Sequence, residues 1–505
     1  MRSYKHILSI ALLIGALAYT LWFVFAGFGN HQDPLYWLYK YEQLEGGWLA
    51  SGTLLVGGAI VKIFGAQLLP LRLAGWLCVV AAIALPYGCL LTKEQRKENL
   101  HWLALTYIVM GYGAFQEFSP GTLSVLLLSA LWVTQSPILL GLAVAARFPN
   151  IIALLVLVPI WKKRNIWNIP IAALTAGVVY LLGYFFITPA SMDAAMSSHD
   201  FFPMISKLWT GGGKLIGYVL IAIAVLAIGK FEIKNLKSKI INAIIAGLLL
   251  LYFAYFTIKP FQWYNADLTY LLSALILVIT IKSQIINPKS KILIGAIIIM
   301  IATLGTDTAW LKLFPAVLCL LPVAAAYYEP QMRRYLFIVL AILSVFVAIR
   351  MTTNSVGQSN LTKTNTFATI APYQHIAIRA AEEQRLLQYK ADYDSLQYEQ
   401  MVNEQMVNVL AIGQENHLMR AVTGCDAARF NEFWSNIYDS VYTAKYREII
   451  RAEHPIIFCS FSPQFKTKPT YVDRESAFEK MLREEGYHEI DRSKYKYMIY
   501  VKEIQ

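Results

Sequence analysis

Charged residues are scarce in this chain. Asp, Glu, Lys and Arg make up 15% of its 505 residues, whereas 57% are hydrophobic and the mean hydropathy is +0.48. Soluble domains carry about 25% charged residues, so the composition excludes a water-soluble globular protein. The apolar, aromatic-rich composition also excludes a disordered chain. We therefore expect a polytopic membrane protein.

Cysteine is rare as well, and the spacing of the five cysteines makes no metal-binding pattern. They are Cys78, Cys89, Cys319, Cys425 and Cys459. The first three lie in apolar segments and are expected to be inert core residues. Cys425 and Cys459 can pair if the C-terminal region faces an oxidising compartment, a question the sequence leaves open. No cofactor and no metal site are predicted; a divalent metal remains chemically admissible, but no residue pattern indicates one.

Acidic residues are few in the first 350 positions, where 12 Asp and Glu face 26 Lys and Arg. Residues 351–505 hold 20 acidic against 18 basic residues. The basic excess therefore belongs to the apolar part of the chain. In membrane proteins such an excess marks cytoplasmic loops, so the pI of about 9.2 does not indicate nucleic-acid binding.

Long apolar runs dominate residues 1–350. The first, 8–27, has no small-residue cleavage site after it, so we expect an uncleaved span with a cytoplasmic N-terminus. Thirteen spans are predicted in all, and an odd number places the C-terminal region on the opposite side. Several are shorter than the ~20 residues that cross a bilayer, so they are tilted, broken or paired into single spans. The other twelve are 69–92, 101–116, 121–135, 137–147, 149–161, 168–188, 213–229, 240–258, 266–282, 291–306, 313–328 and 334–350.

The loops between these spans differ in charge. Six loops assigned to the cytoplasmic side carry 17 Lys and Arg: 2–6, 93–99, 162–165, 230–239, 282–291 and 328–334. The short outer loops 117–120, 259–265 and 307–312 carry only Lys259 and Lys312. This bias supports the assigned orientation.

The acidic residues show the complementary distribution. Eight of the twelve lie at or near the outer face: Asp33, Glu42, Glu45, Glu117, Asp193, Asp200, Asp267 and Asp307. Any one of them can simply be tolerated there. Because eight gather on one face of an acid-poor bundle, we expect the polar chemistry on the outer side.

Two outer loops are distinctive. The first, 28–68, carries aromatic residues at 36, 37, 39, 41 and 48, a composition suited to helices lying among lipid headgroups. The second, 189–212, contains His199 and Asp200 and runs into a glycine triplet at 211–213.

The C-terminal region has a different composition. Residues 351–373 are polar and are expected to be a linker, and 374–505 are expected to form a small extracytoplasmic α/β domain. Its predicted elements are helices at 374–410, 431–453 and 473–486 and strands at 455–461 and 495–502.

The position of Asp33, just past the first span, suits a general base that deprotonates a hydroxyl or amine acceptor arriving from outside. The other substrate would be a sugar linked to a lipid phosphate, with the phosphate bound by outer-face cations. The available cations are Arg72, Arg147, Lys207, Lys214 and Lys259.

Three segments resemble the GT-C glycosyltransferases, in the branch of protein mannosyltransferases and the lipid A aminoarabinose transferase. The first is similar to that family's first outer loop, the second to its entry into span 2, and the third to a recurring Gly-Leu-Ala…Lys/Arg segment. They are Asp33-Pro34-Leu35-Tyr36 with Leu44-Glu45-Gly46-Gly47-Trp48; Ile63-Phe64-Gly65 with Leu71-Arg72-Leu73; and Gly141-Leu142-Ala143 with Ala146-Arg147-Phe148-Pro149. The resemblance covers roughly residues 1–350.

The resemblance implies an all-α, GT-C-like membrane protein of about thirteen helices with Asp33 as catalytic base. Arg72 and Arg147 would be structural or would bind phosphate. Two departures matter: Pro34 replaces the usual second carboxylate, and 50–53 replace a proline-rich stretch. The further candidate substrate-binding residues are Tyr36, Glu42, Glu117, His199, Asp200, Lys259 and Asp307.

Each of these residues also has a structural interpretation. Asp33 can cap an amphipathic helix at 34–45, with Pro34 at its first position, and Arg72 can extend its charge from the end of a span to the interface. A charge among apolar runs, as at Arg147, is costly and usually functional. Glu117 and Asp307 can line or cap helices, and His199 can be a solvated loop residue.

We therefore expect an inverting integral membrane glycosyltransferase of the inner or plasma membrane. It would move a sugar from a polyprenyl-phosphate donor to an extracytoplasmic protein, lipid or glycan, with no nucleic-acid partner. A transporter or lipid flippase would need polar residues along a path through the bilayer and, often, internal repeats, and no repeat is visible. A polysaccharide polymerase or ligase would favour a large outer loop late in the chain.

Overall fold

The computed structural model describes most of the chain as helix. The described residues are 2–27, 33–110, 117–163, 165–189, 213, 215–223, 267–287, 291–304, 309–354, 361–402, 408–412, 416–425, 440–459, 480–490, 495 and 497–502. The helices up to residue 354 are α1 (Arg2–Phe25), α2 (Asp33–Gln43), α3 (Ser51–Phe64), α4 (Leu68–Leu90), α5 (Lys93–Met110), α6 (Pro120–Thr134), α7 (Pro137–Ala146), α8 (Ala153–Lys162), α9 (Asn168–Phe186), α13 (Asp267–Ile286), α14 (Ile292–Met300), α15 (Ala309–Leu318), α16 (Leu321–Ala325) and α17 (Pro330–Asn354).

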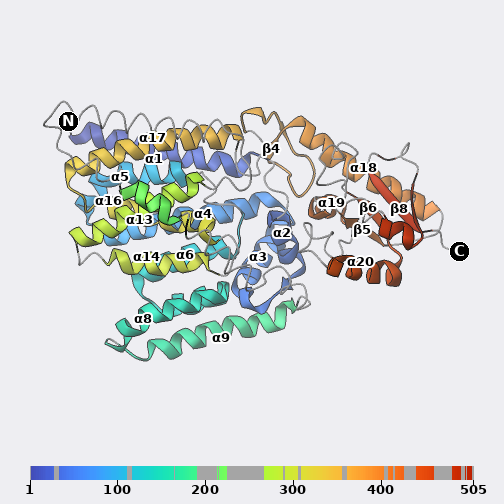
Figure 1. The fold of residues 1–505 in the computed structure, drawn as a ribbon, viewed down its shortest axis with the longest axis horizontal. Helices are drawn as coiled ribbons and strands as arrows, with labels where there is room; N and C mark the ends of the chain where they lie inside the picture. The colour runs from blue at the N-terminus through green and yellow to red at the C-terminus, as the bar shows by residue number, and fades with distance from the viewer. Residues whose placement is uncertain are drawn as a thin grey trace.

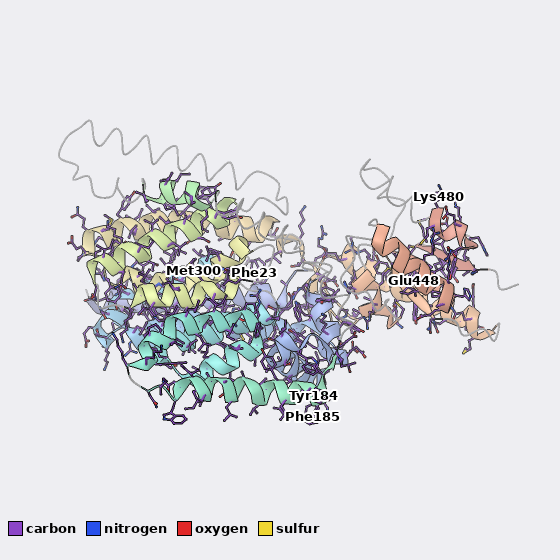
Figure 2. All side chains as sticks on the ribbon, turned by 60° about the horizontal axis from the view of Figure 1, so that its bottom comes forward. Phe23, Tyr184, Phe185, Met300, Glu448 and Lys480 are labelled. Carbon is purple, nitrogen blue, oxygen red and sulfur yellow. The ribbon has the colours of Figure 1, made fainter. Side chains whose placement is uncertain are left out.

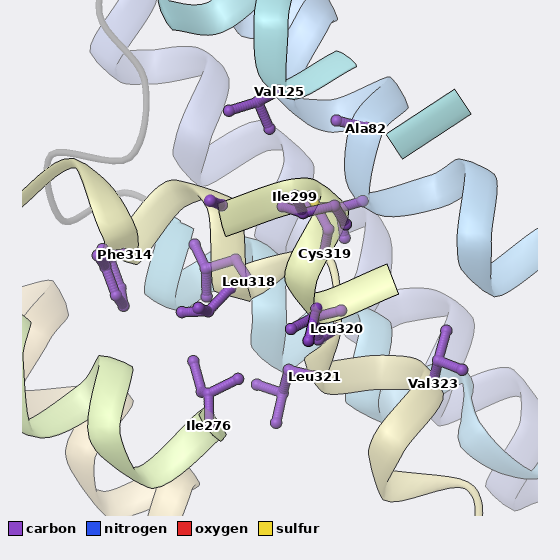
Figure 3. Close-up of a cluster of buried hydrophobic side chains, with 14 of the residues drawn as sticks. Ala82, Val125, Ile276, Ile299, Phe314, Leu318, Cys319, Leu320, Leu321 and Val323 are labelled. Atoms are coloured by element: carbon purple, nitrogen blue, oxygen red, sulfur yellow. The ribbon is translucent and has the colours of Figure 1, made fainter. Parts of the chain in front are cut away.

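These helices form an elongated bundle (Figure 1); most of them share one apolar core, whereas α2 and α3 bury their side chains in a second cluster with the C-terminal region. α1 packs on α5, α4 on α6, α7 on α9, and α13 on α15 and α16. Figure 3 shows the centre of this core, where Ile299 of α14 and Cys319, between α15 and α16, lie among leucines. Both side chains are fully buried. Branched apolar side chains fill the space between helices at the density of an organic crystal, which fixes the helices relative to one another.

Three described helices are long and apolar enough to cross a membrane: Tyr4–Phe25, Leu68–Leu90 and Asn168–Phe186. Six shorter apolar helices lie at Trp48–Phe64, Pro120–Thr134, Pro137–Ala146, Phe148–Lys162, Tyr270–Ile286 and Ile292–Thr303. The expected span 240–258 and the last residues of the span 213–229 lie outside the described residues. A count of thirteen therefore stays a prediction.

α9 shows which surface of the bundle is apolar. Tyr184 is 59% exposed and Phe185 is 69% exposed, and both project from the edge of the molecule (Figure 2). Leu174 and Leu181 on the same helix are exposed too. A row of large apolar side chains on one surface marks a surface that faces lipid or another apolar partner.

The described parts of the basic loops lie at one end of the bundle, near the N-terminus (Figure 1). There the Arg333 guanidinium donates to Asn99 Oδ1 over 3.0 Å. Two indole N–H groups connect further loops at this end: Trp161 donates to Gln135 O over 3.1 Å, and Trp132 donates to Lys291 O over 3.3 Å. We call it the basic end.

The opposite end collects the segments predicted to face outward. Phe118 N donates to Leu71 O, and Thr188 N donates to Leu44 O, both over 2.8 Å. The C-terminal region joins the bundle here, because Gly27 N, just past α1, donates to Ala377 O over 2.8 Å. We call it the opposite end. The described parts of the loops therefore divide between two ends of the bundle, and the side of a membrane on which each end lies stays a prediction.

The first outer loop is more ordered than the predicted 40-residue loop, because it contains α2, a second helix α3 and a short strand. β1 (Glu45–Gly46) pairs in parallel with β2 (Thr188–Pro189), and the 3₁₀ turn η1 (Trp48–Ala50) precedes α3. Besides the aromatic helix α2, the loop expected at 28–68 thus contains α3, whose fourteen residues are mostly apolar.

α2 packs closely on α3 because α3 presents two glycines to it. A Cβ on Gly57 would overlap the Tyr41 ring, and a Cβ on Gly58 would overlap Leu44. On α2, Leu35, Leu38 and Tyr41 are buried at spacings of three residues, the pattern of an amphipathic helix with one packed face.

The C-terminal region contains a four-stranded sheet of order β5-β6-β8-β7. β5 and β6 are parallel, and the other two pairings are antiparallel. Its elements are β3 (Thr366–Phe367), β4 (Ala377–Ile378), α18 (Ala380–Val402), β5 (Val409–Ile412), α19 (Asn416–Thr423), α20 (Ser440–Glu453), β6 (Ile456–Cys459), β7 (Tyr487–Glu489) and β8 (Met498–Lys502). The predicted helix 374–410 is too long, since α18 ends at Val402 and β5 lies within its last residues.

Alternate residues of each strand face opposite sides of the sheet. In β6, Phe458 lies in the cluster with α18 and α19, whereas Cys459 lies in the cluster with α20. Cys425 belongs to the first of these clusters. Cys425 and Cys459 are therefore on different sides of the sheet, and no disulfide joins them. Of the cysteines expected in the core, Cys89 is exposed, because it lies at the end of α4.

The close packing of α2 on α3 makes a testable prediction. Gly57→Ala should destabilise the protein by about 1–3 kcal/mol, because the added methyl overlaps a buried ring in a packed contact. Gly177→Ala in α9 is the control, since a Cβ there meets nothing within 4 Å and alanine favours the helix by about 0.5–1 kcal/mol. Thermal unfolding in detergent distinguishes the two; equal midpoints would contradict the packing.

Candidate functional site

α2 begins at Asp33 and continues through Pro34, so the candidate base lies at the first position of this helix, one residue before the predicted start. Its side chain lies outside the described part of the structure. Pro34 and Leu35 are buried against the bundle. The backbone at Asp33 is therefore held at the opposite end by the packed face of α2.

Arg72 and Glu117 form a buried ion pair beneath α2. The Arg72 Nε donates to Glu117 Oε1 over 3.1 Å, and the two side chains are 4% and 8% exposed. Arg72 Nη1 donates to Gly27 O over 2.9 Å, and the guanidinium lies 5.9 Å from the Tyr373 ring. Arg72 therefore joins the end of α1 to α4, to the segment before α6 and to the C-terminal region.

The Nη2 atom of Arg72 is buried, and its N–H groups have no hydrogen-bond acceptor among the described residues. An unsatisfied buried donor costs free energy, so this nitrogen is suited to an anionic oxygen. Because Glu117 already balances the charge, Arg72 is mainly a structural residue with one donor available for a ligand.

Tyr41 supports the same region from α2. Its hydroxyl donates to Phe118 O over 2.9 Å, next to Glu117. Burial raises the pKa of Tyr41 well above its usual range, so the phenol keeps the proton that it donates in this bond. This bond connects α2 to the Arg72–Glu117 pair.

Arg147 lies where α7 ends and the 3₁₀ turn η2 (Phe148–Ile152) begins. Its guanidinium donates to Ala302 O in η4 (Ile301–Thr303). Asn150 Nδ2 donates to Ala143 O over 2.8 Å, which supports the break between α7 and α8. Arg147 is thus at the opposite end, where it holds two chain segments together.

The remaining α2 residues face the C-terminal region. Lys40 lies over the Tyr36 ring at 4.3 Å, and the His417 ring meets Tyr36 edge-on with centroids 5.8 Å apart. Glu42 is exposed and borders a cavity of about 200 Å³ between α2 and α19. Both apolar and polar side chains line the cavity. Its lining is Leu35, Leu38, Tyr39, Glu42, Gln43, Ala66, Ala371, His417, Arg420, Ala421, Gly424 and Cys425.

The structure thus brings Asp33, Tyr36, Glu42, Arg72 and Glu117 to one region, with Arg147 at the same end of the bundle. The other candidates, His199, Asp200, Lys259 and Asp307, lie outside the described residues, as do Lys207 and Lys214. Within the described ranges no group of three or more His, Cys, Asp or Glu could hold a metal ion.

Sequence reasoning missed the residues that join α2 to its neighbours. The Tyr39 hydroxyl donates to Glu45 Oε2 over 2.8 Å, and the Arg420 guanidinium lies 3.1 Å from the centroid of the Tyr39 ring. The aromatic pattern of α2 was a signal for Tyr39. Arg420 was missed because it lies in α19, a helix of eight residues that the sequence analysis did not predict.

Compared with known proteins, the chain matches no family model and no curated protein sequence.

The buried ion pair gives the next prediction. Glu117→Gln should destabilise the protein by about 3–5 kcal/mol, because it leaves the Arg72 charge buried without its counter-charge. The double variant Arg72→Met with Glu117→Leu should regain much of this loss, since apolar side chains of similar volume replace the pair. Both are measured by denaturant unfolding in detergent.

The control is the exposed pair between Lys390 and Asp394, whose charged atoms are 2.8 Å apart. Asp394→Asn should change stability by less than about 1 kcal/mol, because solvent screens the pair. If Glu117→Gln and Asp394→Asn lose the same free energy of unfolding, the buried Arg72–Glu117 pair contributes no more to stability than the exposed pair does.

Proposed function

We propose that this protein is a GT-C-like integral membrane glycosyltransferase that moves a sugar from a polyprenyl-phosphate donor to an extracytoplasmic acceptor. The observation that carries the proposal is the location of α2. This helix begins at Asp33 and is packed at the end opposite the basic loops, above the Arg72–Glu117 pair. A transfer of this kind uses a general base and a cation that binds the phosphate, and α2 carries the candidate base while Arg72 is the candidate cation.

The proposed reaction is a single displacement with inversion. The acceptor oxygen or nitrogen attacks the anomeric carbon while the bond from that carbon to the phosphate oxygen breaks. The acceptor proton goes to the Asp33 carboxylate, and the bonding electrons leave with the polyprenyl phosphate. The spare donor of Arg72 would bind a phosphate oxygen and stabilise the negative charge that develops there.

The membrane arrangement belongs to the same proposal. About thirteen spans would place the N-terminus in the cytoplasm and the C-terminal α/β region outside. The segregation of basic loops at one end supports this orientation, and the exposed apolar residues of α9 support contact with lipid. The protein would lie in the inner or plasma membrane, where its donor is dissolved in the bilayer.

The decisive experiment is a transfer assay with Asp33→Asn. Purified protein would be incubated with a radiolabelled polyprenyl-phosphate sugar and a cell-envelope extract. We expect Asp33→Asn to lower the rate by at least about 10²-fold, because an amide cannot accept the acceptor proton. The control is Glu94→Gln, an exposed carboxylate near the basic end, which should transfer as the wild type does.

The other outcomes discriminate between the hypotheses. Equal transfer by wild type and Asp33→Asn would retain the enzyme and reject Asp33 as the base. If the wild type transfers no label and instead moves the labelled lipid across liposome membranes, the protein is a flippase and the proposed function is wrong.

A further inference from the structure

α19 of the C-terminal region lies beside α2 (Figure 1). Two faces of α19 have different roles. Leu418, Met419 and Val422 are buried in the cluster that covers the sheet. The other face, at 417, 420, 421 and 424, borders the cavity against α2. This spacing of three and four residues is one stripe of a helix, so the sequence of α19 serves two partners.

A close contact across this boundary joins Arg420 and Tyr39. The guanidinium carbon lies over the ring, 3.1 Å from its centroid, which is within the range of a cation–π contact. The planar guanidinium covers the ring face in a way that a flexible ammonium does not reproduce. One side chain of the C-terminal region therefore fixes the orientation of an α2 side chain.

The contact continues into the second outer segment. The Tyr39 hydroxyl donates to Glu45 Oε2 over 2.8 Å, and Glu45 begins β1, which pairs with Thr188 of β2. Direct contacts thus run from the C-terminal region through α2 to the residues that precede the segment 190–212. The first and last of these steps join parts of the chain that are distant in sequence.

Both boundaries of the first outer segment are also bonded to the C-terminal region. Gly27 N donates to Ala377 O over 2.8 Å, and Leu68 N donates to Pro372 O over 2.9 Å. Near the second bond, Gln67 Nε2 donates to Gln374 Oε1 over 3.0 Å. The C-terminal region therefore contacts this segment before α2, after α3 and along α2 itself.

We propose that Arg420 and Tyr39 are positioning residues through which the C-terminal region holds α2, and with it Asp33, in place. An isolated helix of eleven residues is marginal in water, so the position of α2 depends on tertiary contacts of this kind. The catalytic consequence rests on the proposed function, whereas the mechanical one does not.

The mechanical consequence is measured by hydrogen exchange on the full-length protein in nanodiscs. Arg420→Gln should raise the exchange rates of the amides at 35–43 by about tenfold, because local opening becomes easier. Arg420→Lys should give an intermediate increase, since an ammonium is still attracted to the ring. Peptides from β5 and β6 should exchange as in the wild type, which shows that the C-terminal region remains folded.

Arg451→Gln is the matched control. Arg451 pairs with Glu485 over 2.8 Å on the α20 side of the sheet, so its loss removes an arginine from the same region without touching α2. Exchange at 35–43 should be unchanged in this variant. Unchanged exchange at 35–43 in Arg420→Gln would overturn the proposal, whatever the effect on activity.

The catalytic consequence is a split between kinetic constants. Arg420→Gln should lower kcat by roughly 10²-fold, as expected for a catalytic group displaced by about 1 Å, and leave the KM for the lipid-linked donor unchanged. Arg420→Lys should restore part of the loss. Faster exchange in α2 with an unaltered kcat would overturn the positioning role. If the wild type transfers no sugar, the proposed function fails, and hydrogen exchange alone decides whether the C-terminal region holds α2.

Discussion

The guanidinium of Arg72 is the group on which the opposite end of the bundle depends. A buried charge is tolerated only when partners compensate it, and its partners come from distant segments: Glu117 before α6, the Gly27 carbonyl after α1 and the Tyr373 ring of the C-terminal region. These partners fix the ends of α1, α4 and α6 relative to one another. The surface on which α2 packs follows from that arrangement.

Close approach of helices is the second constraint. Small residues allow it: Gly57 and Gly58 receive α2, and a Cβ on Gly141 would overlap α9. Van der Waals contact at such distances leaves little room for adjustment. α2, the short helix that begins at the candidate base, is therefore held by its close packing on α3 and by the contact of Arg420 with Tyr39. The arrangement gives α2 a fixed position without a long hydrophobic face of its own.

Much of this organisation was predictable, because it depends on local composition. The sequence predicted the apolar helices, the amphipathic helix after Asp33 and the strands that became β6 and β8. The alternation of basic and acid-bearing loops along the chain also predicted which loops lie at the same end, and the described parts of the basic loops do so. Three elements were not predictable in this way. α3 was apolar but counted as loop, β5 was masked by a helix-like neighbourhood, and β7 has only three residues.

The sequence by itself determined the apolar, mostly helical character of the chain and the asymmetry of its charge, because hydropathy and charge are properties of each residue and need no partner. Only the tertiary structure decided that Arg72 pairs with Glu117, that Cys425 and Cys459 face different sides of a sheet, and that Arg420 lies over the Tyr39 ring. These contacts join residues far apart in the chain. They form only when whole helices and strands pack together, so local hydropathy and charge do not specify them.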